Sequence, residues 1–268
     1  MIHAAWFRLL WAVCVLSLAA CATGGMQTGK EGTGADLTTE SDEPEARKRA
    51  RIRTELASGY FEQGQTAIAL DEIKQAIAAD PSYAPAFNLR GLTYLRLNEV
   101  ELARDSFRRA QSLAPRDPDI AHNLAWLLCQ QRQFADSHVL FNQALAQPTY
   151  AGKAKTLMAQ GVCHARAGDV AQAEATLLRS FELDPGNPVT AYSLAQLMFK
   201  RGDAANAQFY LRRLNAGTLA NAETLWLGIK VEMKLGNRLA ARQLGDQLRR
   251  QFPQARELQA YERGAFDE

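Results

Sequence analysis

Cysteine and histidine are the residues of this chain best suited by type to do chemistry. Cys129 and Cys163 lie well inside the sequence, and His122, His138 and His164 lie near them in the chain. Zinc sites usually pair their ligands at short spacing, as in C-x-x-C or H-x-x-x-H. No such pair occurs in the sequence. We therefore expect no metal site, and the two thiols are candidates for a disulfide instead.

The sequence also lacks the common motifs of catalysis. It contains no G-x-S-x-G, no H-E-x-x-H and no Gly-Lys-Ser/Thr. Glycines between Gly24 and Gly34 suggest a phosphate-binding loop at first sight, but no strand precedes them. We expect no enzyme, no cofactor and no small-molecule substrate.

The charge balance limits the partners. The formal net charge is +2 over 268 residues, and 22% of the residues are charged. Nucleic-acid binders usually carry a marked basic excess, so we expect no nucleic-acid partner. Hydrophobic residues make up 47% of the chain, which is ample for a buried core.

The first residues have the pattern of a processed leader. Arg8 precedes an apolar run over residues 9–20, which is too short for a comfortable membrane span and suits a signal peptide. The run ends in Leu18-Ala19-Ala20-Cys21, which resembles the lipobox of bacterial lipoproteins. That resemblance implies a diacylglycerol on the Cys21 sulfur and cleavage before Cys21. The alternative is an ordinary secretory signal with an incidental cysteine.

A tether is expected between the lipid and the folded part. Residues 22–45 are rich in glycine, threonine and acidic residues and show no periodicity, so they cannot bury enough surface to order themselves. We expect a signal peptide at 1–20, a lipidated Cys21 with its tether at 21–45, and a repeat domain at 46–268. Ala22 stands where an Asp would mark inner-membrane retention in lipoproteins, which favours the outer membrane.

The repeat domain is predicted from a recurring period. Pro81 and Pro115, each closing a helical pattern, are 34 residues apart, which is the tetratricopeptide period. The pattern predicts an all-α, right-handed superhelix of about six tetratricopeptide repeats, with a C-terminal capping helix at 255–264. The six repeats begin at Ala50, Ala84, Pro118, Ala154, Pro188 and Asn221.

Packing explains the pattern. Small residues at repeat positions 8, 20 and 27 let helices A and B of a repeat approach closely, and large residues at positions 4, 7, 11 and 24 fill the space around them. Leu56, for example, takes position 7 of the first repeat. Four glycines fall in the turns between helices A and B, where a left-handed residue helps to end a helix: Gly64, Gly168, Gly202 and Gly236.

A partner-binding groove is expected on the A helices, which line the concave face of this fold. The side chains there are unusually apolar in the middle repeats, and exposed apolar patches and aromatic anchors mark partner sites. The alternative is that some of them pack between neighbouring A helices. The predicted groove residues are Asn88, Leu92, Leu95, His122, Trp126, Met158, Tyr192 and Phe199.

Cys129 and Cys163 occupy near-equivalent places on the A helices of repeats three and four. Those helices pack side by side, and the compartment implied by the leader is oxidising, so we expect a disulfide. The alternative is two buried thiols too far apart to bond.

The chain as a whole resembles the PilF/PilW group of type IV pilus biogenesis and stability lipoproteins. The resemblance rests on the lipobox, the two extra residues before repeat four, and three local strings: HNLAWLLC at 122–129, LWLGI at 225–229 and LRRQFP at 248–253. Members of that group act as pilotins, which bind subunits of the pilus secretin and support its assembly in the outer membrane. Some act later and stabilise assembled pili.

The resemblance implies a lipid-anchored outer-membrane scaffold that faces the periplasm and binds pilus secretin subunits. Two other functions stay open: a general lipoprotein adaptor that docks cell-envelope enzymes, and an outer-membrane assembly subunit.

Overall fold

The structure is a computed structural model and describes residues 42–266. The predicted signal peptide, Cys21 and nearly all of the predicted tether lie outside these residues. The described part forms thirteen α-helices and no strand. Among its helices, none is both long enough and apolar enough to cross a membrane.

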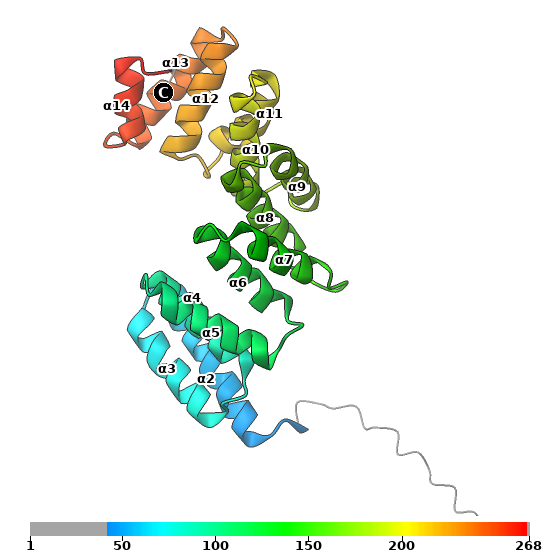
Figure 1. Ribbon diagram of the computed structural model, residues 1–268. Coiled ribbons are helices and arrows are strands. Elements are labelled where there is room, and N and C mark those ends of the chain that lie inside the picture. Colours follow the sequence, from blue (N-terminus) through cyan, green and yellow to red (C-terminus); the bar gives the residue numbers. More distant parts are fainter. Residues whose placement is uncertain (1–41, 267–268) are drawn as a thin grey trace, which may run out of the picture. The chain divides into compact units, whose positions relative to one another are not determined.

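Twelve of the helices form six A–B pairs, which confirms the predicted repeats. Figure 1 shows the pairs stacked in chain order, so that each repeat packs on the next. The A helices are α2 (Glu45–Glu62), α4 (Ala84–Arg96), α6 (Pro118–Gln130), α8 (Lys153–Ala167), α10 (Pro188–Lys200) and α12 (Ala222–Lys234). The B helices are α3 (Thr66–Ala79), α5 (Val100–Leu113), α7 (Phe134–Leu145), α9 (Val170–Leu183), α11 (Ala204–Ala216) and α13 (Arg238–Gln251).

The capping helix predicted at the C-terminal side is α14 (Arg256–Arg263). It packs against α12 and α13, and its Leu258 joins the core of the last repeat. Gly264 ends it in the left-handed region, at a φ of 72°.

The turns within the repeats use left-handed residues, as predicted. Gly64, Gly168, Gly202 and Gly236 all have positive φ. In repeats two and three the same place is taken by Asn98 and Arg132, both with a φ of 62°. Asparagine visits this region readily, whereas arginine is strained there.

Close approach of helices A and B requires glycine at position 8 of repeats two and four. A Cβ atom on Gly91 would lie 2.5 Å from the Phe107 ring, and one on Gly161 would lie 2.6 Å from Leu177. Phe107 and Leu177 are themselves buried completely. Positions 8 and 24 of these two repeats are therefore in direct contact.

One predicted core position is wrong. Leu56 is 43% exposed, because no described repeat precedes α2 to cover that side of it. Farther along the array, the corresponding Leu124 and Leu194 are buried between neighbouring repeats.

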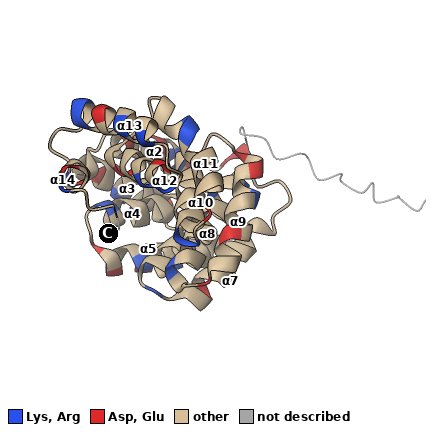
Figure 2. Cartoon of the chain, turned by 90° about the horizontal axis from the view of Figure 1, so that it is seen from above, with Lys and Arg blue, Asp and Glu red and all other residues tan. Residues whose placement is uncertain are grey.

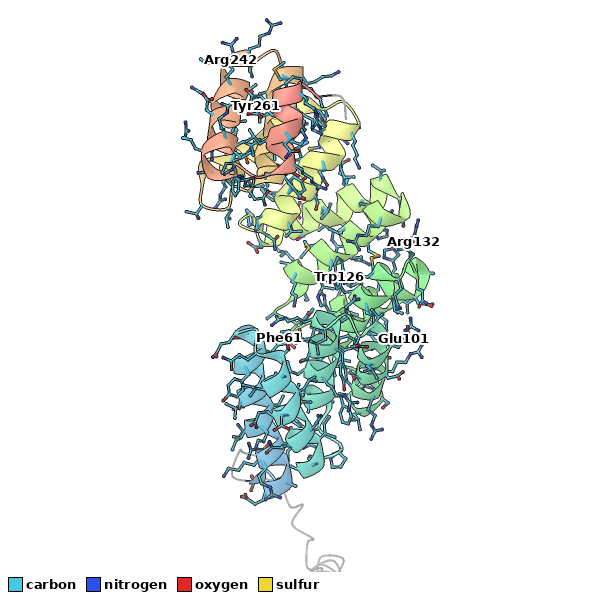
Figure 3. All side chains as sticks on the ribbon, turned by 90° about the vertical axis from the view of Figure 1, so that its left-hand side faces the viewer. Phe61, Glu101, Trp126, Arg132, Arg242 and Tyr261 are labelled. Atoms are coloured by element: carbon cyan, nitrogen blue, oxygen red, sulfur yellow. A yellow bond between two sulfur atoms is a disulfide. The ribbon has the colours of Figure 1, made fainter. Side chains whose placement is uncertain are left out.

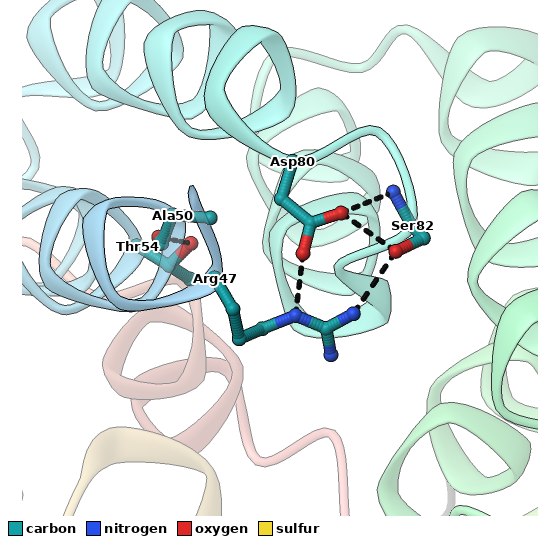
Figure 4. Close-up of polar contacts among 5 residues, drawn as sticks. All are labelled: Arg47, Ala50, Thr54, Asp80 and Ser82. Carbon is teal, nitrogen blue, oxygen red and sulfur yellow. Dashed lines mark hydrogen bonds and ion pairs between the residues drawn. The ribbon is translucent and has the colours of Figure 1, made fainter. Parts of the chain in front are cut away.

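Repeats one and two are also joined by a polar turn, shown in Figure 4. After α3 ends, the Asp80 carboxylate accepts hydrogen bonds from the Ser82 amide (2.8 Å) and the Ser82 hydroxyl (2.6 Å). Arg47 of α2 donates to both Asp80 and Ser82. The Ser82 hydroxyl, more than any other group, lowers the Asp80 pKa below its ordinary value. This network fixes the first turn of α2 to the start of the second repeat.

Charged residues of both signs are spread over the helices, as Figure 2 shows. This agrees with the small net charge of the sequence.

Candidate functional site

The face formed by the A helices carries aromatic rings covered by cations from the next A helix. The first example joins α2 and α4: the Arg96 guanidinium carbon lies 3.5 Å from the centroid of the Phe61 ring, and Arg96 also donates to the Phe61 carbonyl. Figure 3 shows Phe61 and Trp126 on one side of the array, with Glu101 and Arg132 on the other.

The second example joins α6 and α8. The Arg166 guanidinium carbon lies 5.2 Å from the centroid of the half-buried Trp126 ring. A cation in this position is attracted to the negative face of the ring. Trp126 also packs against the core that contains Cys129 and Phe141.

The third example joins α10 and α12. The Lys230 ammonium lies 5.8 Å from the centroid of Phe199 and 5.4 Å from that of Trp226. Burial lowers the pKa of Lys230 below its ordinary value, because the charged form loses water. Lys230 therefore presents a partly desolvated positive charge between two aromatic rings.

Most of the other predicted groove residues are half-buried on the same helices. The Asn123 amide donates to the Asn88 oxygen at 3.0 Å and so joins α6 to α4. Leu92 and Leu95 pack against the core between repeats two and three. Met158 is half-buried on α8.

Tyr192 lines a pocket of about 240 Å³ with Gln196, Trp226 and Arg256. Its hydroxyl accepts a hydrogen bond from the Gln196 amide at 2.9 Å. Burial, above all other causes, raises the pKa of Tyr192 above its ordinary value, so it stays protonated at neutral pH.

The prediction that His122 lies on an open groove is wrong. His122 is 5% exposed, and its Nδ1 lies 2.9 Å from the Thr156 hydroxyl of the neighbouring A helix. Burial, together with the charge of Lys155, lowers its pKa to about 4. Tyr150, in the extra segment before repeat four, also bonds Thr156, at 3.1 Å. The extra segment therefore extends this polar network through the half-buried Tyr150.

The face is less openly apolar than the sequence suggests. None of the eight predicted groove residues belongs to the large hydrophobic side chains that are strongly exposed in the described part. The most exposed of these side chains lie on B helices, such as Leu239 on α13 (72%) and Phe209 on α11 (65%). The A-helix face instead combines half-buried rings with the cations above them.

Cys129 and Cys163 are brought together as the repeat register predicts. Their Cα atoms are 5.8 Å apart, a distance that a disulfide spans, and their sulfur atoms lie within bonding distance. Both side chains are buried. The Ser137 hydroxyl lies 3.5 Å from the Cys163 sulfur.

The three histidines do not converge with the cysteines on one site. His138 and His164 stack with 3.8 Å between ring centroids, and His122 lies in the separate network with Thr156. Burial lowers the pKa of both stacked histidines below the ordinary value. No group of three or more metal-ligating side chains occurs within residues 42–266.

Comparison with known proteins identifies the family. The tetratricopeptide-repeat family model matches residues 54–118 and 122–188. The type IV pilus assembly protein PilF of Pseudomonas aeruginosa is 26% identical over 251 residues, which are 94% of this chain and 97% of PilF. The crystal structure of PilW, a widely conserved type IV pilus biogenesis factor, is 32% identical, with a TM-score of 0.74 over 79% of this chain and 97% of PilW. This chain belongs to the PilF/PilW family. A P. aeruginosa PilF structure, 24% identical with a TM-score of 0.75 over 82% of this chain and 99% of that one, shows the same fold.

A PilF/PilW protein of this kind is a tetratricopeptide-repeat protein of type IV pilus biogenesis, and its fold mediates protein–protein interaction.

The groove cations were missed by sequence reasoning, although a signal was present. Two of the three cations that cover rings, Arg96 and Arg166, stand at position 13 of their repeats, a position that faces the groove.

Proposed function

We propose that this PilF/PilW protein is an outer-membrane lipoprotein that binds subunits of the pilus secretin through its A-helix face. It supports the localisation and assembly of the secretin and thereby the stability of pili. It acts as a scaffold without catalytic activity of its own.

The observation that carries this proposal is the row of rings and cations on successive A helices. Phe61 with Arg96, Trp126 with Arg166, and Phe199 with Lys230 each join neighbouring repeats. Aromatic and arginine side chains are the commonest hot spots of protein interfaces. The rings are already half-buried and fixed before a partner arrives, so little side-chain entropy is lost on binding.

The anchor is proposed from the sequence. Lipid on Cys21 would hold the protein at the membrane, and residues 22–45 would let the repeat domain reach its partner. Anchoring both molecules near one surface raises their effective concentration, so a moderate affinity for each secretin subunit is enough.

The Cys129–Cys163 disulfide is part of the proposal. It would tie the A helices of repeats three and four together beside Trp126. The ring and its cation would then keep their relative positions while a partner is bound.

Secretin capture tests the proposal. Tagged full-length protein is expected to copurify the secretin from its own cells, and Trp126→Ala and Leu95→Ala variants are expected to lose most of it. Phe209→Ala is the matched control, since Phe209 is an exposed ring on a B helix. Undiminished capture by both groove variants would remove the groove from the mechanism. Capture of cell-envelope enzymes without secretin would favour the general adaptor instead.

A further inference from the structure

The A-helix face ends in a basic pocket between repeats five and six. Its volume is about 570 Å³, which is within the range of ligand sites. It opens where α10 and α12 end. The side chains that line it are Phe199, Lys200, Lys230, Met233, Lys234 and Phe266.

The charge of this pocket has one sign. Among the residues that the structure describes, three that line the pocket are lysines and none is acidic. The acidic side chains of the adjoining Tyr192 pocket, Glu223 and Glu257, are held by Arg256 at 3.6 and 2.8 Å. Lys200 and Lys234 are exposed and take part in none of the ion pairs found within residues 42–266. The pocket therefore has positive charge to offer a partner.

Its walls are aromatic and adaptable. The left-handed Gly264 turns the chain back after α14, so that the Phe266 ring reaches Trp226, with 5.7 Å between ring centroids. Phe199 and Met233 line the same pocket, and Met233 is 36% exposed. Methionine adapts its shape to an incoming ring and makes favourable contacts with it.

We propose that this pocket binds an acidic segment of the partner that contains an aromatic residue. The ring would enter between Phe199, Met233 and Phe266, and carboxylates on either side of it would pair with the lysines. An acidic segment fits because Lys200 and Lys234 offer two exposed ammonium groups, and no carboxylate lines the pocket within residues 42–266. This inference rests on the proposed partner-binding function, and it names the chemistry of one end of that interface.

The test uses a fluorescein-labelled peptide, Gly-Ser-Asp-Glu-Phe-Asp-Glu-Ser-Gly, titrated with the purified full-length chain. Binding is expected to weaken by about tenfold or more when Asn and Gln replace the acids, or when Ala replaces the Phe. A Lys200→Glu/Lys234→Glu variant is expected to weaken it as much. Lys48→Glu/Lys74→Glu is the matched control, because both of those lysines are exposed on the first repeat.

Equal binding of the neutral peptide, or an equal loss with the control variant, would overturn the inference. Circular dichroism and thermal melting show whether each variant is folded; the substituted lysines are on the surface, so folding should be retained. Secretin capture with the same variants separates the two claims. If capture succeeds and is insensitive to Lys200→Glu/Lys234→Glu, the pocket inference fails and the proposed function stands. If the peptide binds at the lysines and secretin is never captured, the proposed function fails and the pocket stands.

Discussion

The guanidinium of Arg166 lies over the indole ring of Trp126, with 5.2 Å between its carbon and the ring centroid. Trp126 is on α6 and Arg166 is on α8, so the contact joins the A helices of two successive repeats. It places a positive charge and an aromatic surface at one point of the groove. Both are partner-binding features, and the cation on the ring is already in place before binding.

Arg166→Gln is expected to weaken secretin capture while leaving the fold intact. An exposed cation–π contact contributes about 0.5–1 kcal/mol, so the free energy of unfolding should fall by no more than this. Chemical denaturation measures that change, and copurification measures capture. Arg108→Gln, at an exposed site on a B helix, is the control and should alter neither. The role given to Arg166 would be contradicted if Arg166→Gln lowered the free energy of unfolding by clearly more than this. It would also be contradicted if the variant captured secretin as well as wild type.

Gly91→Ala is expected to destabilise the protein by about 1–3 kcal/mol, because the added methyl group overlaps the buried Phe107 ring. Gly59→Ala is the matched control within α2. A Cβ there meets nothing within 4 Å, so alanine should stabilise by about 0.5–1 kcal/mol through helix propensity. Urea denaturation of the two variants beside wild type gives both values. If Gly91→Ala and Gly59→Ala changed the free energy of unfolding by the same amount and in the same direction, Gly91 would not be a point of close contact between the helices.

Cys129→Ser/Cys163→Ser is expected to lower the free energy of unfolding by about 3–4 kcal/mol if the pair is bonded. The bond would close a loop across a sequence separation of 34, and the loss follows from the larger entropy of the open unfolded chain. Wild type treated with a reductant should melt like the variant. A reductant without effect on wild type would show that the two sulfurs remain thiols.

His122 is expected to make stability depend on pH below neutrality. Its pKa is about 4 in the folded protein against an ordinary value of 6.5, so the unfolded chain binds more protons between these limits. The contribution of His122 to the free energy of unfolding is fully present above pH 6.5 and is lost as the pH falls to about 4. It amounts to roughly 3 kcal/mol at most. His122→Gln should reduce this dependence of the free energy of unfolding on pH.

Urea midpoints measured at pH 7 and pH 4.5 for both proteins give the comparison. His138 and His164 also have lowered pKa values, but they are present in both proteins and cancel in the difference. The same pH dependence in wild type and His122→Gln would contradict the assignment to His122.

The repeat architecture could be predicted because its determinants are local. Gly91 and Phe107 lie within one repeat, and the period of the sequence places them against each other. Pro81 and Pro115 follow the helices that they were expected to end, since α3 stops at Ala79 and α5 at Leu113. The register of neighbouring repeats then brought Cys129 to Cys163.

The character of the groove was harder to predict because it depends on contacts between repeats. His122 stands at a position that usually faces the groove, but it is buried and bonds Thr156 of the next repeat, and Tyr150 of the extra segment bonds Thr156 in turn. In the same way Arg166 covers Trp126 from another repeat. The period of a sequence assigns a face to each residue, whereas coverage by a neighbour depends on how the repeats stack.

The amount of secretin multimer in outer membranes, read from an unboiled gel blot, tests the central claim most directly. The comparison is between wild type, a deletion strain and a Cys21→Ala strain. We predict that multimers vanish in the deletion strain and that they fall or mislocalise with Cys21→Ala. Multimers untouched in both strains would contradict secretin assembly as the function of this protein.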